Sequence, residues 1–142
     1  MRRLPQDIAE DIACFVPIEG DWRQLDGLAQ ELWASGRTRD MLWAPFALFE
    51  RFPADEDGCG VFWSILHGIE ALDGYEDELA ESLRRQPSEF GILLAGRMLN
   101  AGIETLAGAP LVPFLQSIAV SPSCPASVAA TALRYLGRRA GT

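Results

Sequence analysis

The chain has 142 residues, of which 49% are hydrophobic and 23% charged, and this composition excludes an intrinsically disordered protein. Twenty acidic against 12 basic side chains give a formal net charge of -8, which disfavours binding to nucleic acid or anionic lipid and favours a basic partner. The apolar runs are too short to span a membrane, and Arg2 and Arg3 are followed by no apolar signal segment. We therefore expect one cytoplasmic helical-repeat domain over residues 1–142.

Helical periodicity runs through almost the whole chain, and no run alternates strictly between apolar and polar residues. The predicted helices cover, in chain order, residues 5–15, 21–35, 38–52, 60–72, 75–85, 87–100, 110–120 and 126–139. Asp21 is the expected N-cap of the second helix, and Pro45 is expected to kink or split the third. We expect an all-α protein with about eight helices and no strands.

Four prolines that break the predicted helices recur with a regular period. Pro17, Pro53, Pro87 and Pro122 are separated by intervals of 36, 34 and 35 residues, and each break lies between two helices. A period of this length that holds two helices is typical of an α-solenoid, in which stacked neighbours bury the apolar face of each hairpin. The pattern predicts four stacked hairpins in a HEAT-like α-solenoid, with an irregular helical bundle as the alternative.

The three cysteines do not form a recognisable motif. Cys14, Cys59 and Cys124 lie far apart in the sequence, and the chain has a single histidine, so a closed zinc site is not expected. Free cysteine is usually buried, and we therefore expect buried, reduced thiols and neither a metal nor a cofactor.

Two groups of acidic residues lie at the two ends of the predicted helix at 60–72. The first group is Asp55, Glu56 and Asp57, and the second is Asp73, Glu76, Asp77, Glu78 and Glu81. The first fits a solvated loop, and the second fits a helix N-terminus, where the helix dipole favours carboxylates. Together they also fit a surface that attracts a cationic partner and speeds its association.

The single histidine, His67, is predicted to share one helical face with Trp63 and Glu70, because the three residues are spaced by four and then three positions. A general base or a metal ligand at His67 needs a nucleophile or further ligands, and the sequence shows neither beside it. The alternative is a histidine that orients a neighbour or donates a hydrogen bond to a loop.

A second polar stripe is predicted on the helix at 87–100, where Glu89, Arg97 and Asn100 lie near one face. This helix and the one that carries His67 occupy equivalent places in the two central hairpins, so the two stripes can face the same groove. The alternative is a buried polar network that ties the hairpins together, for example Glu70 with Arg97.

Common catalytic motifs are missing from the sequence. It contains no G-x-G-x-x-G, G-x-x-x-x-G-K-[ST], G-x-S-x-G or H-E-x-x-H motif. We therefore expect a binding protein and not an enzyme, although a site assembled from scattered residues around His67 leaves no motif to find.

The segment 60–102 resembles small immunity proteins encoded beside bacterial polymorphic toxins of the contact-dependent or type VI secretion kind. The blocks that carry the resemblance are VFWSILHGIE at 61–70, GY at 74–75, LRRQPSEFG at 83–91 and RMLNAG at 97–102. The resemblance implies a cytosolic inhibitor that binds one cognate toxin domain, and many such toxins are nucleases with basic clefts.

The partner-binding residues expected on this basis lie in the centre of the chain, where hairpins have rigid neighbours on both sides. They are Asp55, Glu56, Asp57, Trp63, His67, Glu70, Asp73, Glu76, Asp77, Glu78, Arg97 and Asn100. The alternative function is an intracellular α-solenoid adaptor or regulatory module that binds a peptide or protein partner.

Overall fold

The computed structural model describes residues 4–54 and 58–140. Its elements are α1 (Pro5–Ala13), α2 (Arg23–Ala34), the 3-10 helix η1 (Thr38–Met41), α3 (Trp43–Arg51), α4 (Cys59–Glu70), α5 (Glu76–Arg85), α6 (Glu89–Asn100), β1 (Thr105–Leu106), β2 (Ala109–Pro110), α7 (Leu111–Ala119) and α8 (Ala126–Ala140). The predicted all-α class is confirmed, and each of the eight predicted helices has a counterpart in the described residues.

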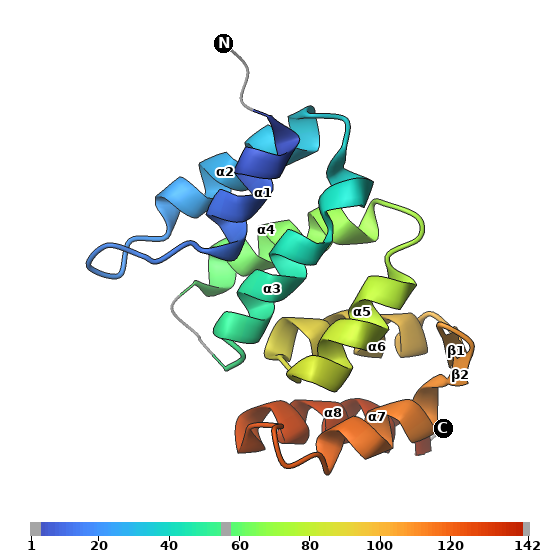
Figure 1. Ribbon diagram of the computed structural model, residues 1–142. Helices are drawn as coiled ribbons and strands as arrows, with labels where there is room; N and C mark the ends of the chain where they lie inside the picture. Colours follow the sequence, from blue (N-terminus) through green and yellow to red (C-terminus); the bar gives the residue numbers. More distant parts are fainter. Residues whose placement is uncertain (1–3, 55–57, 141–142) are drawn as a thin grey trace.

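The helices form four hairpins that lie one after another, from α1 and α2 at one end to α7 and α8 at the other (Figure 1). The first helices of the hairpins form one row, in which α1 contacts α3 and α3 contacts α5. The second helices form the other row, in which α2, α4, α6 and α8 contact one another in turn. Each hairpin therefore buries its apolar side against the next, as the proline period predicts.

Helix α7 joins the first row through a side-chain contact. The guanidinium of Arg84 on α5 lies 5.1 Å from the ring centroid of Phe114 on α7. A cation over an aromatic ring attracts it electrostatically. Helix α7 also contacts α6, and α8 contacts α6 as well, so both helices of the last hairpin pack on the hairpin before it.

Local signals explain where several helices begin and end. Ser88 is the N-cap of α6, and its hydroxyl accepts a hydrogen bond from the Gly91 N–H at 3.0 Å. Gly74 follows α4 with φ of +87°, a left-handed conformation that stops a helix at little cost for glycine. Helix α5 begins at Glu76 and ends at Arg85. It has acidic residues in its first turn and arginines in its last turn, the distribution that the helix dipole favours.

One expectation about helix ends needs correction, and another is confirmed. Asp21 is not the N-cap of α2; Trp22 holds that position, and the Asp21 carboxylate accepts a hydrogen bond from the Arg23 N–H at 2.9 Å. The predicted helix at 38–52 is split into η1 and α3. Pro45 lies in the first turn of α3, where its missing N–H leaves no intrahelical hydrogen bond unmade.

The expectation of no strands is wrong in one place. Strands β1 and β2 pair antiparallel, with Leu106 opposite Ala109. The two residues between them, Ala107 and Gly108, have φ of 51° and 81°, as a tight two-residue hairpin requires. With two residues each, the strands are too short to show a period of two in the sequence.

The core of the first three hairpins is built around aromatic rings. Phe49, Phe62 and Phe90, from α3, α4 and α6, lie with ring centroids 5.3 to 5.5 Å apart. Trp22 packs edge-on against Phe62 at 5.4 Å, which brings the first hairpin into the same cluster. Aromatic side chains bury large areas, so this cluster is a main source of the stack's cohesion.

Polar side chains bridge neighbouring hairpins at the ends of the helices. Arg51 on α3 donates to the carbonyl oxygens of Ala13 and Phe15 at 2.9 and 2.8 Å, which satisfies acceptors at the C-terminus of α1. The neighbouring Glu50 accepts hydrogen bonds from Arg85 of α5 at 3.0 and 2.9 Å. Helix α3 is therefore fixed to the hairpins on both sides of it.

The cysteines differ from the expectation of buried thiols. Cys14 is exposed and Cys124 is half-buried, and both are free thiols. Burial raises the pKa of the Cys124 thiol. The side chain of Cys59 lies outside the described residues.

No helix in residues 4–54 and 58–140 is long and apolar enough to cross a membrane.

Candidate binding surface

The structure brings together four of the residues that the sequence predicts for partner binding. Trp63, His67 and Glu70 lie along one side of α4, and Arg97 reaches them from α6. These four residues are called the Trp63–Arg97 cluster below. Because α4 and α6 belong to adjacent hairpins, the cluster spans the junction between the two central units.

An ion pair lies at the centre of the cluster. The Arg97 Nε donates to a Glu70 carboxylate oxygen at 2.7 Å, and this hydrogen bond raises the pKa of Arg97. The other Glu70 oxygen lies 3.5 Å from His67 Nδ1. The pair between Glu70 and Arg97 that the sequence suggested is therefore present and links the two hairpins. It lies at the surface and not in a buried network, because the side chains of Arg97 and Glu70 are 41% and 24% exposed.

Trp63 connects this surface to the core. Its ring lies edge-on to Phe90 of α6 at 5.5 Å and 5.8 Å from the His67 ring. Trp63 is half-buried, whereas His67 is exposed. The contact between Trp63 and Phe90 therefore fixes α4 against α6. His67 and the ion pair are exposed to solvent on this rigid support.

Two tyrosines near the cluster were not predicted from the sequence as site residues. Burial raises the pKa of Tyr75, the carboxylates of Glu70 and Glu76 raise it further, and Arg97 opposes them. The Tyr75 phenol therefore stays neutral beside these acids. Tyr135 of α8 packs its ring over Gly96 of α6, next to Arg97 in the chain. No sequence spacing connects either tyrosine with α4, so only the fold could identify them.

The remaining predicted residues lie around the cluster or outside it. Asp73 and Asp77 are exposed, and Glu76 and Glu78 are half-buried at the start of α5. Asn100 is exposed at the end of α6, one turn beyond Arg97. The predicted residues Asp55, Glu56 and Asp57 lie outside the described residues.

Glu89 does not share the stripe of Arg97, contrary to the sequence-based expectation. Its carboxylate accepts a hydrogen bond from the Thr131 hydroxyl of α8 at 2.9 Å. Glu89 therefore connects α6 to the last hairpin, whereas Arg97 connects α6 to α4.

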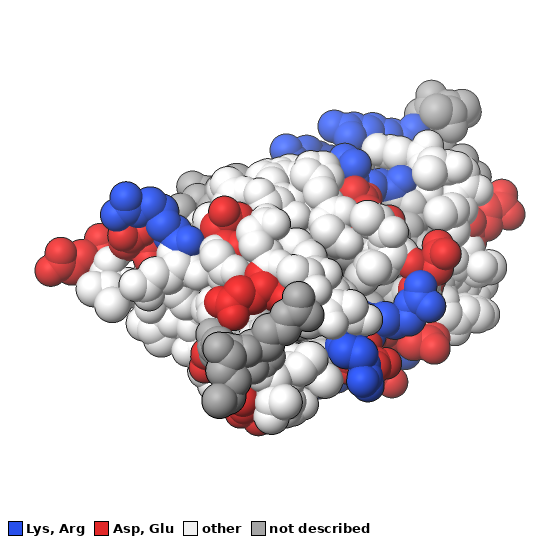
Figure 2. All heavy atoms as spheres, turned by 90° about the horizontal axis from the view of Figure 1, so that it is seen from above, with Lys and Arg blue, Asp and Glu red and all other residues white. Residues whose placement is uncertain are grey.

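The acidic side chains are distributed in several groups. Figure 2, seen from the end that α1 and α2 form, shows separate clusters of Asp and Glu with Arg beside some of them and wide uncharged surface between. Among the residues that the structure describes, no three His, Cys, Asp or Glu side chains are placed to hold a metal ion.

Comparison of the chain with protein-family models, with curated proteins and with solved structures finds no match. The candidate surface therefore rests on its own geometry and chemistry.

Proposed function

We propose that this protein is an immunity protein that binds a cognate secreted bacterial toxin in the cytoplasm and neutralises it by direct contact, without catalysis or a cofactor. The observation that carries the proposal is the Trp63–Arg97 cluster, an exposed aromatic and charged surface across two adjacent hairpins. All four residues of the cluster lie in the blocks that resemble immunity proteins.

The chemistry of the cluster suits a binding hot spot. Tryptophan and arginine are among the residue types most enriched at such positions, and hot spots depend on rigid support. The Arg97 guanidinium is oriented by Glu70 through Nε, and the planar group carries five N–H donors in a fixed fork. A partner carbonyl or carboxylate can therefore be recognised without a large loss of side-chain entropy.

The surrounding carboxylates favour a toxin domain with a basic surface. Asp73 and Asp77 are exposed beside the cluster, and the net charge of the chain is -8. Charges at the rim of an interface mainly raise the association rate, and salt screens them. We expect these acids to steer the partner and the cluster to hold it.

The test begins with the genes that flank the gene for this chain. Where a secreted toxin is encoded directly upstream, we expect its toxin domain to bind this protein, and cells that produce that domain to be protected by it. His67→Ala and Arg97→Gln are expected to raise the dissociation constant at least tenfold, because each removes an exposed group of the cluster. The matched control is Arg23→Gln, which removes another exposed arginine with a carboxylate partner, Asp21, outside the cluster.

Binding by the cluster variants that equals wild-type binding, in proteins that melt as wild type does, contradicts the proposed site. Asp73→Lys with Asp77→Lys is expected to slow association and weaken its salt dependence. A chain that binds no toxin but captures a helical or extended peptide instead supports the adaptor function.

A further inference from the structure

The connection between α1 and α2 contains a loop, residues 16–21, that extends away from the helices (Figure 1). This 16–21 loop carries two large apolar side chains in contact with solvent, Val16 at 62% and Ile18 at 67% exposed. Among the large apolar residues that are exposed in the described part of the chain, only these two lie within three positions of each other. Single exposed apolar residues are normal on a protein surface, whereas neighbouring ones often mark an interaction site.

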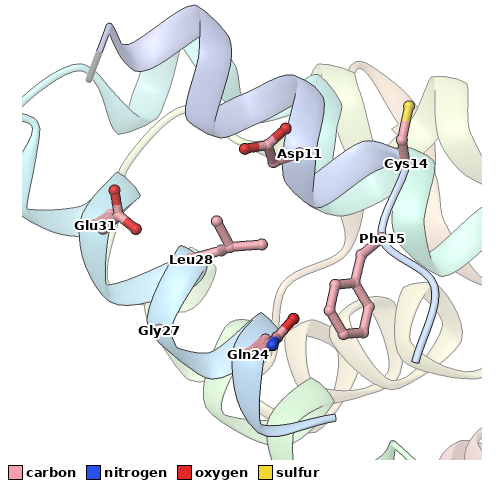
Figure 3. A pocket seen from close by; sticks show the side chains of 7 residues that line it. All are labelled: Asp11, Cys14, Phe15, Gln24, Gly27, Leu28 and Glu31. Carbon is pink, nitrogen blue, oxygen red and sulfur yellow. The ribbon is translucent and has the colours of Figure 1, made fainter. Parts of the chain in front are cut away.

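Both ends of the 16–21 loop are fixed in the core. Phe15 and Trp22, directly before and after it, are buried, and their ring centroids lie 5.7 Å apart. Figure 3 shows the Phe15 ring directed into the space between α1 and α2, where it lines a groove together with Gln24 and Leu28. The Arg51 guanidinium donates to the Phe15 carbonyl oxygen at 2.8 Å. The chain therefore enters and leaves the loop at fixed points.

The loop also contains a tight turn. The Asp21 N–H donates to the Ile18 carbonyl oxygen at 2.9 Å, and this hydrogen bond joins backbone atoms without the help of a side chain. The two central residues, Glu19 and Gly20, have φ of 51° and 77°, as a type I′ turn requires. Pro17 fixes φ just before the turn. The loop backbone is therefore preorganised, which reduces the entropy that is lost when a partner binds.

A second turn of the same kind shows that the turn geometry does not force this exposure. Ala107 and Gly108 have φ of 51° and 81°, and Leu106, in the position equivalent to Ile18, is fully buried. Glu19 is also an unusual choice for its position, because asparagine, aspartate and glycine adopt positive φ at lower cost. The local fold therefore accounts neither for an exposed Ile18 nor for Glu19.

The base of the 16–21 loop contacts the helix that carries the Trp63–Arg97 cluster. A Cβ atom on Gly58, the N-cap of α4, would lie only 2.9 Å from the Trp22 ring. Trp63 follows Gly58 by five positions, which is about 8 Å along a helix axis. An interface of standard size covers about 800 Å² on each partner. One partner domain can therefore cover the cluster and the loop together.

We propose that the 16–21 loop is a second contact with the toxin and inserts Val16, Ile18 and Glu19 into a concave site of the toxin domain. A rigid protrusion is complementary to a cleft, its apolar side chains to apolar walls, and the exposed Glu19 carboxylate to a basic group there. A loop seated in a cleft also excludes substrate from it. This inference rests on the proposed function, because the toxin domain is the partner named there.

The test compares binding of that toxin domain to the full chain and to two loop variants. Ile18→Ser is expected to raise the dissociation constant about tenfold, because it removes an apolar group from the contact. Its control is Ile103→Ser, which replaces an exposed apolar residue outside the loop and the cluster. Glu19→Asn is expected to weaken binding about threefold but to melt at or above the wild-type temperature, because asparagine tolerates positive φ. Its matched control is Ala107→Asn, which makes the same backbone change in the other turn.

Cys14 offers a readout that requires no substitution. Its thiol is exposed two positions before the loop, whereas the half-buried Cys124 between α7 and α8 serves as an internal reference. Iodoacetamide labelling, located by mass spectrometry, is expected to slow at Cys14 and to stay unchanged at Cys124 when the toxin domain is bound.

The outcomes separate this inference from the proposed function. A wild-type protein that binds no toxin domain overturns the proposed function and the loop contact with it. Binding that is weakened by Arg97→Gln but equals wild type in both Ile18→Ser and Glu19→Asn overturns the loop contact alone. Unchanged labelling of Cys14 in the complex overturns it as well. Weaker binding by both loop variants, with both controls equal to wild type and with all melting curves cooperative, supports it.

Discussion

The first and last hairpins attach to the stack by the same device. The Trp33 ring of α2 lies over Gly68 of α4, and the Tyr135 ring of α8 lies over Gly96 of α6. In both cases an aromatic ring of a terminal helix occupies the place that a side chain on the central helix would fill. A glycine within a helix lowers helix stability, so the close packing of the ring compensates for that loss.

The first and last hairpins differ in the buried side chains that surround this contact. Trp22 of the first hairpin joins the aromatic cluster through Phe15, Phe52 and Phe62. The last hairpin buries one phenylalanine ring, that of Phe114, and otherwise aliphatic side chains such as Leu115 and Ile118. The same docking geometry is therefore supported by very different amounts of buried aromatic area, and the first hairpin should be the more firmly attached.

The largest expected effect comes from the aromatic cluster. Phe62→Ala is expected to lower the free energy of unfolding by about 4 kcal/mol, because it removes a fully buried ring and leaves a cavity among four aromatic neighbours. Phe114→Ala in the last hairpin is the control, and we expect about 3 kcal/mol, since its ring is slightly exposed. Urea unfolding measures both, and equal losses would show that the aromatic cluster contributes no more to stability than Phe114 of the last hairpin.

Intermediate changes in the free energy of unfolding are expected when Gly96 and Gly68 are replaced by alanine. Gly96→Ala is expected to cost about 2 kcal/mol, because the new Cβ overlaps Tyr135 at Cγ, an atom that cannot move without shifting α8. In Gly68→Ala the new Cβ would lie 2.5 Å from Cζ2 and 2.7 Å from Cε2 of the half-buried Trp33 ring. That ring can turn aside, and alanine favours the helix by about 1 kcal/mol, so the net change should stay within about 1 kcal/mol.

Thermal melting compares the stability of the two glycine variants. The control is Gly60→Ala, whose new Cβ meets no neighbouring atom within 4 Å. A Gly68→Ala variant that is less stable than Gly96→Ala would show that the first hairpin has the tighter contact.

The smallest expected effect is the loss of stability when acid protonates Asp21. The hydrogen bond from the Arg23 side chain lowers the pKa of Asp21 from 3.8 to about 2. Because the folded-state pKa is depressed, the stabilisation is present above pH 3.8 and is lost as the pH falls toward about 2. An NMR titration is expected to place the Asp21 midpoint near 2, and Arg23→Gln should move it toward 3.8.

The last hairpin is the internal control for this titration. Residues 105–142 contain no Asp or Glu, so their amide resonances, apart from those around Thr131 beside Glu89, should stay fixed while the Asp21 signal moves. Coupled shifts in α7 and α8 would show that acid loosens the whole stack and does not titrate one loop alone.

Much of the fold follows from local signals. Helix periodicity and the prolines at 17, 53, 87 and 122 indicated the helices and their pairing, because a broken helix must turn back to bury its apolar side. The 3-10 helix η1 and the hairpin of β1 and β2 were missed. Both are too short for periodicity, and their conformations depend on neighbouring packing.

The candidate surface was predictable only within one helix. Spacing places Trp63, His67 and Glu70 on one side of α4, because residues three or four apart lie on the same face of a helix. Spacing does not determine which residue of another helix meets them. Arg97 and Glu89 were expected on one stripe, yet the structure turns Arg97 toward Glu70 and Glu89 toward Thr131.

The sequence by itself determined the all-α class, the approximate limits of the helices and the segregation of the acidic residues before position 105. These properties depend on local periodicity, capping and composition. Only the tertiary structure decided that Trp33 and Tyr135 pack on glycines and that Arg97 pairs with Glu70 at the surface. The reason is that these contacts depend on the rotation and offset of one helix against another, which side-chain packing sets across many residues at once.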